Sequence, residues 1–416
     1  MNLLKFVIIL INTVSFIYMI YYLIIAIFAF KRKKLNINNN FKNKFAIVIP
    51  ARNEELVIGN LIQSLNKQNY PKDKYDVFVL PNNCSDDTEK ISQKMGAKII
   101  DSKKKLINSK GDALRTAFEN LKEKDYNAYI IFDADNIVHP EFINNMNNYL
   151  CLGYRVAQGY RDSKNPSDTW ISSSHSLHYI IQNFFMNKSR MNINKSCFIN
   201  GTGFMISKEI INEYGYDSST ITEDIELTVK CGLNNEKIAF VENAITYDEQ
   251  PTDFIVSWKQ RKRWSVGTLQ CLKQYFKLIV KDILKNKNFE SIDSIMFLVA
   301  PIVQLIGTFN CLLQIFLSFL IGAKVDYLFK SILLILYYIT NIILALGIVK
   351  ISQKQIKNYI KGIIFLPIFY LSWVPINLIA LFEKELKWEK TEHKKSVSLE
   401  SILTLNYINN GLNVEK

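Results

Sequence analysis

Charged residues are absent from four long apolar stretches, and these stretches divide the chain into parts. The stretches are Phe6–Phe30, Ser294–Ala323, Ser331–Val349 and Gly362–Phe382. About 20 apolar residues in a helix cross a bilayer core of roughly 30 Å, so each stretch is long enough to span a membrane. A polar block between the first two is large enough for one globular domain. We therefore predict an anchor over residues 1–34, a polar domain over 35–285, a membrane bundle with interfacial segments over 286–383 and a polar tail over 384–416.

Basic residues predict the orientation of the polar domain. Lys31, Arg32, Lys33 and Lys34 follow the first apolar stretch directly. The positive-inside rule places them in the cytoplasm together with the domain, in a multi-pass protein of the cell membrane. A cleaved signal peptide would carry its basic residues before a shorter apolar run and end at a small-residue cleavage site. The first stretch is longer, and its basic cluster comes after it.

The C-terminal stretches conflict with the same rule. If the last three stretches each cross once, the lysine-rich tail ends on the outside. The stretch Gly362–Phe382 is interrupted by Pro367 and Pro375. We therefore consider it a candidate for an interfacial or re-entrant segment. The number of crossings and the side of the C-terminus stay open at this point.

The polar domain alternates between predicted strands and predicted helices. Short β-rich runs cover Phe45–Pro50, Asp76–Leu80, Ala97–Ile100 and Ala128–Phe132, and helical spacing covers Glu54–Gln68, a segment from Asp86, and Gly111–Lys122. Such alternation predicts parallel βαβ units and a doubly wound α/β sheet. Ligands of such sheets bind beyond the carboxyl ends of the strands. Polar residues follow three of these ends, at 52–54, 82–83 and 133–135.

Two carboxylates one residue apart end the fourth predicted strand. Asp133 and Asp135 follow an apolar run in the sequence Ile-Ile-Phe-Asp-Ala-Asp. Hard cations prefer carboxylate and phosphate oxygen, so this pair suits Mg²⁺ or Mn²⁺ bridged to a diphosphate. A D-x-D sequence is also frequent by chance in solvated strand-end loops.

Two further motifs each allow a functional and a structural interpretation. The sequence Thr222-Glu223-Asp224 either starts a helix with a threonine cap and favourable acids or holds Asp224 as a general base. Gln260, Arg263 and Trp264 either bind phosphate and a sugar ring or belong to a basic helix lying on the membrane.

Two glycine-containing segments are weaker signals. Asn200-Gly201-Thr202-Gly203-Phe204 is a turn where backbone can approach a ligand closely, although a plain turn has the same pattern. Lys110-Gly111 precedes a predicted helix and could place an ammonium and backbone N–H groups near phosphate.

The order and combination of these motifs resemble glycosyltransferase family 2. The similarity is to its membrane-bound branch, which contains cellulose, hyaluronan and poly-N-acetylglucosamine synthases and ceramide glucosyltransferase. It covers residues 45–268 by motif and the remainder by layout. The resemblance implies a GT-A (Rossmann-like) domain on the cytoplasmic side, a UDP-sugar donor and a metal, Mg²⁺ or Mn²⁺.

The resemblance also assigns roles to individual residues. Asp224 would be the catalytic base, and Asp133 and Asp135 would hold the metal. The donor would meet Ala51, Arg52, Asn53, Glu54, Asn82, Asp86, Lys110 and Asp133, and the acceptor or pyrophosphate would meet Gly201, Thr202, Gly203, Glu223, Gln260, Arg263 and Trp264. Family members usually have aspartate where this chain has Asn82, which leaves the nucleotide preference open. Trp388–His393 would fold back toward the site.

The charge and the cysteine content indicate which ligands and which compartment suit the protein. The formal net charge is +13, but its lysines are dispersed, so attraction to anionic lipid and a pyrophosphate explains it better than nucleic acid. The six cysteines are scattered without C-x-x-C spacing, which suits reduced thiols in the cytoplasm.

The sequence leaves two acceptors open, and we predict the first. It is a growing β-linked cell-surface polysaccharide, such as one of the cell wall, extended with N-acetylglucosamine or glucose by a single inverting displacement. The alternative is a membrane lipid that receives one sugar. About four spans offer little wall for a polymer channel, so the first would need an oligomer or an accessory export subunit. A scaffold without activity is disfavoured by the complete set of carboxylates, and a transporter by the absence of ionisable residues from the spans.

Overall fold

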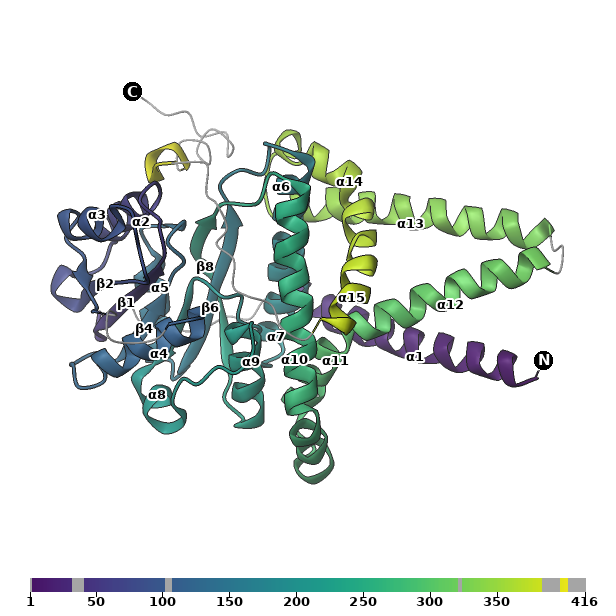
Figure 1. Ribbon diagram of the computed structural model, residues 1–416, viewed down its shortest axis with the longest axis horizontal. Helices are drawn as coiled ribbons and strands as arrows, with labels where there is room; N and C mark the ends of the chain where they lie inside the picture. The colour runs from purple at the N-terminus through teal and green to yellow at the C-terminus, as the bar shows by residue number, and fades with distance from the viewer. Residues whose placement is uncertain (1, 32–40, 102–106, 321–323, 384–396, 403–416) are drawn as a thin grey trace.

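A mixed eight-stranded sheet forms the centre of the polar domain (Figure 1). The computed structural model describes residues 2–31, 41–101, 107–320, 324–383 and 397–402. The strands are β1 (Phe45–Ala51), β2 (Tyr75–Pro81), β3 (Lys98–Ile99), β4 (Ala128–Ile131), β5 (Ile137–Val138), β6 (Val156–Ser163), β7 (Phe204–Ser207) and β8 (Ile238–Asp248). Their order across the sheet is β3-β2-β1-β4-β7-β6-β8-β5.

The first half of the sheet is parallel, as the sequence predicts. β1 pairs in parallel with β2 and β4, and β2 pairs in parallel with β3. β1 and β4 are continuous apolar runs because both of their faces are buried; Phe45 to Ile49 of β1 have no exposed surface, whereas the edge strand β3 begins with the exposed Lys98. The second half was not predicted: β7 is antiparallel to both β4 and β6, and β5 is antiparallel to β8.

Helices pack on the faces of this sheet. They are α2 (Ile58–Asn66), α3 (Thr88–Lys94), α4 (Lys110–Leu121), α5 (Phe142–Cys151), α6 (Trp170–Ile181), α7 (Ser189–Asn192), α8 (Lys208–Tyr214) and α9 (Glu223–Leu233), with short helical segments η2 (Lys72–Lys74) and η3 (Gln182–Lys188). The helix predicted from Glu54 begins later, at Ile58, because residues 54–57 form a turn in which Val57 N–H donates to the Glu54 carbonyl.

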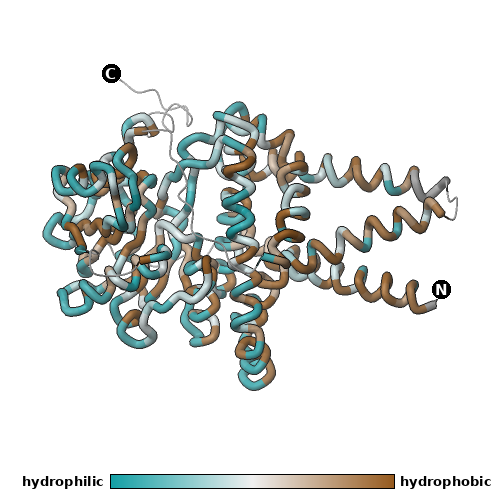
Figure 2. The backbone as a smooth tube through the Cα atoms, viewed as in Figure 1, coloured by the Kyte–Doolittle hydropathy of each residue, from teal (hydrophilic) through white to brown (hydrophobic). Residues whose placement is uncertain are grey.

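The apolar helices extend from one side of the domain (Figure 1). The helices of this part are α1 (Asn2–Ile27), η1 (Phe28–Phe30), α10 (Phe254–Asn286), α11 (Phe289–Leu298), α12 (Ala300–Leu320), α13 (Lys324–Ile351), η4 (Ile356–Asn358), α14 (Ile360–Leu371) and α15 (Trp373–Phe382). Four segments have the length and composition to cross a membrane: Leu3–Phe30, Ala300–Leu320, Leu328–Ile351 and Ile360–Phe382. Figure 2 shows hydrophobic residues along all four.

The fourth apolar segment differs from the other three in direction. α1, α12 and α13 point away from the domain, whereas α14 and α15 run across them, beside α10 (Figure 1). The break between α14 and α15 follows from Pro375, which has no N–H to donate to the Leu371 carbonyl. Arg261 of α10 satisfies groups exposed by the break, donating to the Phe369 carbonyl at 3.3 Å and to Ser372 Oγ at 2.6 Å.

Two contacts tie the ends of the chain to the domain. Buried Arg190 forms a two-pronged ion pair with Asp293 at 2.6 and 2.7 Å, and Tyr21 of α1 donates to the same carboxylate. At the other end, Leu399 and Ile402 pack against β5 and β8. Residues 397–402 therefore lie on the same side of the apolar helices as the sheet.

Candidate active site

One cavity of about 850 Å³ connects the sheet to the apolar helices. It begins at the carboxyl ends of β1, β2 and β4, passes between α9 and α10, and ends against α12, α14 and α15. Position beyond the carboxyl ends of parallel strands is where an α/β sheet binds ligands. The predicted location of the site is thus the location of the cavity.

Strand-end residues line the first part of the cavity. Ala51, Arg52, Glu54, Asn82, Asp133 and Asp135 all contribute to its wall. Two other predicted donor residues do not. Asn53 accepts a hydrogen bond from Ser85 N–H at 2.8 Å, and Asp86 accepts from Thr88 and from Glu55 N–H, so both hold the loops together behind the wall.

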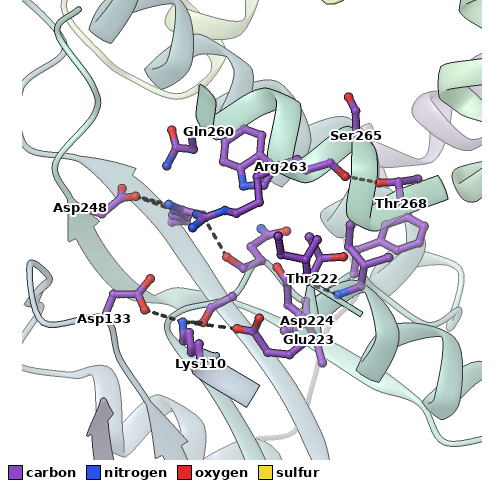
Figure 3. Close-up of a pocket in the computed structure, with 18 of the residues that line it drawn as sticks. Lys110, Asp133, Thr222, Glu223, Asp224, Asp248, Gln260, Arg263, Ser265 and Thr268 are labelled. Carbon is purple, nitrogen blue, oxygen red and sulfur yellow. Dashed lines mark hydrogen bonds and ion pairs between the residues drawn. The ribbon is translucent and has the colours of Figure 1, made fainter. Parts of the chain in front are cut away.

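Lys110 joins the strand-end aspartate to the start of α9 (Figure 3). Its ammonium pairs with Asp133 and lies 3.7 Å from the Glu223 carboxylate. It also donates to the Gly201 carbonyl at 2.7 Å. Three segments distant in sequence therefore direct oxygen atoms at one cation, which marks this point as a site for positive charge.

Of the three residues predicted from the glycine turn, one lines the cavity, and Asn200, which was not predicted, lines it too. Gly201 lines it, whereas Thr202 and Gly203 lie behind the wall, contrary to the prediction. Thr202 is fully buried; its hydroxyl accepts from Asp133 N–H at 3.0 Å and donates to Asn136. Gly203 has a φ of +61° and joins β4 to β6 through backbone hydrogen bonds. Thr202 thus supports the backbone of Asp133 from behind the wall, and Gly203 supports the strands on either side of it.

The start of α9 presents two carboxylates to the cavity. Thr222 occupies the predicted cap position and acids fill the first turn, although the Thr222 side chain makes no capping hydrogen bond among the described residues. Glu223 and Asp224 are each partly exposed to the cavity. Burial raises the pKa of Asp224, and it raises the pKa of Glu223 to about 7, where the charge of Asp224 adds to the effect.

The predicted motif on α10 presents one helical face to the cavity. Gln260, Arg263 and Trp264 are separated by three and four residues and all line it. Figure 3 shows Gln260 and Arg263 across the cavity from Asp224. Among the residues that the structure describes, no hydrogen bond or ion pair engages the Arg263 guanidinium, which leaves its N–H groups available to an anion.

An arginine–aspartate pair beside Asp135 was missed by the sequence analysis. Arg161 of β6 pairs with Asp248, donates to the Asn200 carbonyl at 2.9 Å and lies 4.1 Å over the Tyr179 ring. Burial raises the pKa of Asp248 to about 6, against the effect of Arg161. The pair depends on the parallel pairing of β6 with β8, for which no local pattern gives a signal.

The raised pKa values predict how activity depends on pH. A protonated Asp224 cannot accept a proton, so we expect kcat/KM for the acceptor to fall as pH falls through a pKa above the ordinary aspartate value of about 3.9. Lys110 and Arg161 favour the ionised form, and burial opposes it. Glu223 has the higher pKa, about 7, and is largely neutral where Asp224 takes up its proton, so Glu223→Gln should leave the acidic limb nearly in place. A limb that moves to lower pH in this variant would show that Glu223 is charged when Asp224 titrates.

The comparisons with known proteins agree with this geometry. A family model described as "Glycosyltransferase like family 2" matches residues 42–267, more than half of the chain. A probable glycosyltransferase, YdaM of Bacillus subtilis, is 26% identical over 84% of this chain and 86% of its own length. A poly-beta-1,6-N-acetyl-D-glucosamine synthase of Staphylococcus epidermidis is 24% identical over 83% and 84%.

Two further similarities concern lipid glycosylation and the fold. A beta-monoglucosyldiacylglycerol synthase of Synechocystis is 23% identical over 56% of this chain and 49% of its own length. The structure of mannosyltransferase PcManGT from Pyrobaculum calidifontis, in complex with GDP-Man and Mn²⁺, superposes with a TM-score of 0.62 at 15% identity, covering 92% of this chain and all of that one. The segment Trp388–His393 lies outside the described residues. The sheet, the cavity and the family match together show that this chain is a member of glycosyltransferase family 2 with a GT-A fold.

Proposed function

We propose that this protein transfers a single sugar from a UDP-sugar to a membrane lipid, with inversion at the anomeric carbon. The observation that carries the proposal is the continuity of the cavity, which runs from Asp133 and Asp224 to the beginning of α12 and the first half of α15. A lipid held among the apolar helices can reach the carboxylates through it. The relatives include enzymes named for lipid and for polysaccharide products, so family membership alone does not choose between them.

The chemistry follows from the residues around the cavity. A hydroxyl is a poor nucleophile, so Asp224 takes its proton as the new bond to the anomeric carbon forms. The bond from that carbon to the diphosphate breaks, and the nucleoside diphosphate leaves with its electron pair. Arg263 stabilises the negative charge that develops on it. One displacement without an enzyme nucleophile inverts the anomeric centre.

The residues present fit a divalent cation next to the diphosphate. Asp133 and Asp135 supply hard oxygen ligands, and the cluster around Lys110 is already arranged for positive charge. No group of three His, Cys, Asp or Glu side chains suited to a metal occurs among the described residues, so donor phosphates and water would complete the shell. Bound there, Mg²⁺ or Mn²⁺ would neutralise charge on the leaving group.

The polysaccharide alternative is favoured by one observation, the similarity to the N-acetylglucosamine polymer synthase over most of the chain. The arrangement of the apolar helices is less favourable to it. Within the spans Leu3–Phe30, Ala300–Leu320 and Leu328–Ile351, at most 17% of the most apolar window is buried. Helices so exposed do not enclose a channel within one copy of the described chain.

The experiment is an assay of nucleotide release followed by analysis of the product. Purified full-length protein in lipid nanodiscs is given UDP- and GDP-sugars with Mg²⁺, Mn²⁺ or a chelator. A glycolipid carrying one sugar supports the proposal. A long polymer from one UDP-sugar establishes the synthase instead, and the absence of release from any donor contradicts both.

We further propose that three segments cross the membrane and that α14 and α15 lie at its cytoplasmic surface. Their direction across α1, α12 and α13 supports this arrangement, as does the packing of Leu399 and Ile402 on the sheet. With α12 and α13 crossing as a pair, the tail returns to the side of the domain and the conflict with the positive-inside rule disappears. We expect a cysteine added at the N-terminus of a cysteine-free variant to react with an impermeant reagent on intact cells, and one added at the C-terminus to react only after lysis.

A further inference from the structure

The end of the cavity that lies among the apolar helices is lined by uncharged side chains. Its wall includes Ala300, Pro301 and Gln304 of α12, Tyr370 of α14, and Trp373 and Asn377 of α15. None of these six side chains carries a charge. The charged residues that line the cavity belong instead to the catalytic end, where Arg263 and Asp224 lie.

A chain of hydrogen bonds crosses this apolar end. Ser265 of α10 donates to Asn377 Oδ1 at 2.6 Å, Asn377 Nδ2 donates to Gln304 Oε1 at 2.7 Å, and Gln304 Nε2 lies 3.4 Å from the Tyr370 carbonyl oxygen. Asn377 is 2% exposed, and its side chain nonetheless belongs to the wall of the cavity. We call the side chains of Ser265, Asn377 and Gln304 the amide relay. It draws on three helices, so it is assembled only in the folded bundle.

The relay has hydrogen-bonding capacity beyond its own contacts. A carboxamide carries two N–H donors and an oxygen with two lone pairs. The bonds of the relay occupy one N–H of Asn377 and one of Gln304 among the residues that the structure describes. Helix–helix contact alone would explain one such bond, but a purely structural pair has no reason to line a cavity that leads to the catalytic carboxylates. The remaining donors and acceptors suit the hydroxyl groups of a ligand.

The charges around the relay select against an anionic ligand. Lys262, which precedes the cavity-lining Arg263, is already paired with Glu383 at 2.8 Å. Arg263 itself is committed, in the proposed function, to the departing diphosphate. Arg261, one turn before Ser265 on α10, donates to the Phe369 carbonyl and to Ser372 and does not line the cavity. Among the described residues that form this end of the wall, a phosphate would therefore meet no cation, and beyond the relay it would meet the carboxylates of Glu223 and Asp224.

We propose that the amide relay binds the headgroup of an uncharged lipid that carries free hydroxyl groups, and that it directs one hydroxyl toward Asp224. This inference rests on the proposed function and specifies its acceptor class. In the reaction the acceptor oxygen bonds to the anomeric carbon, its proton passes to the Asp224 carboxylate, and the nucleoside diphosphate leaves with the electron pair of the broken bond. Lipid phosphates are excluded as acceptors.

The test compares lipids that differ in charge and in free hydroxyl groups. The full chain is placed in phosphatidylcholine nanodiscs with the donor that gives the fastest nucleotide release. The acceptors are dioleoylglycerol, its methyl ether without a hydroxyl, dioleoylphosphatidylglycerol with hydroxyls and a charge, and a polyprenyl phosphate. We expect kcat/KM for dioleoylglycerol to exceed that for either anionic lipid at least about tenfold, and no product from the ether. Equal or faster reaction with an anionic lipid overturns the inference but leaves lipid glycosylation standing. A polymer formed without any added lipid contradicts the proposed function itself.

Two variants test the relay directly. Asn377→Leu and Gln304→Leu should each lower kcat/KM for dioleoylglycerol about tenfold, chiefly through KM, the loss expected when a hydrogen bond to substrate is removed. The matched control is Asn310→Leu, because Asn310 is an equally buried amide of α12 that bonds to Asn12 of α1 and does not line the cavity. Slow hydrolysis of the donor in the absence of acceptor reports that each variant is folded. Unchanged acceptor KM in both relay variants, with donor hydrolysis intact, contradicts the role of the relay.

Discussion

Replacing Asp224 with asparagine is expected to lower turnover about 10³-fold while leaving donor binding nearly unchanged. The substitution keeps the size of the side chain. The amide oxygen of asparagine can accept from Ile225 N–H, as a carboxylate oxygen of Asp224 does at 2.9 Å. It removes the basic oxygen that would take the proton of the acceptor hydroxyl. The measurement is the single-turnover rate at saturating donor, with the donor Kd determined separately by calorimetry.

The control for this variant lies in the same segment of the chain. Asp217→Asn removes a carboxylate whose side chain is 78% exposed and which pairs only loosely with Arg115, at 3.4 Å. We expect it to react at the normal rate. Loss of donor binding in Asp224→Asn would move the residue from base to donor site. Turnover within tenfold of normal would leave the proposed mechanism without its base.

The parallel half of the sheet could be predicted because its information is local. β1, β2 and β4 are largely apolar runs that end in polar turns, and the helices α2, α3 and α4 follow β1, β2 and β3, so the βαβ units can be identified in order. The other half, in which β7 and β5 form antiparallel pairs and β6 pairs in parallel with β8, has no such pattern. The segment Val156–Ser163 contains Gln158, Gly159 and Arg161, and it becomes a strand because β7 and β8 lie on either side of it. Its pairing is decided by contacts far apart in sequence.

The candidate site divides in the same way. Asp133, Asp224 and Arg263 were predicted because strand ends and helix faces place side chains predictably once the element is known. Asn53 and Asp86 were assigned to the donor site because they neighbour such residues, and the structure uses their side chains to brace loops. The Arg161–Asp248 pair joins two segments separated by 87 residues, so no motif could have indicated it.

The membrane end of the site shows a third limit of sequence patterns. Ser265, Gln304 and Asn377 are ordinary polar residues within helical stretches, and nothing in their spacing relates one to another. They come together because Pro375 and Arg261 fix the break between α14 and α15, which brings α15 against α10 and α12. An acceptor site built in this way becomes visible only when the packing of three helices is known.

We expect the second large loss of activity when Arg263 is replaced. Arg263→Ala should lower kcat about 10²-fold, because it removes the cation proposed to stabilise the leaving diphosphate. Arg263→Lys should recover part of this loss, since lysine restores the charge but not the two-pronged hydrogen bonding of a guanidinium. The measurements are kcat for each variant and the Kd for UDP, which separates stabilisation of the transition state from binding of the ground state.

The adjacent lysine provides the matched control for Arg263. Lys262 carries the same charge one position earlier on α10, but it pairs with Glu383 at 2.8 Å and does not line the cavity. Lys262→Ala should therefore leave kcat within about twofold of normal, since a partly exposed ion pair contributes little. Equal losses in the two alanine variants would mean that general positive charge on α10 matters rather than a contact at the diphosphate. A loss confined to Arg263 and expressed in kcat, with UDP binding retained, is the result that places its guanidinium at the bond that breaks.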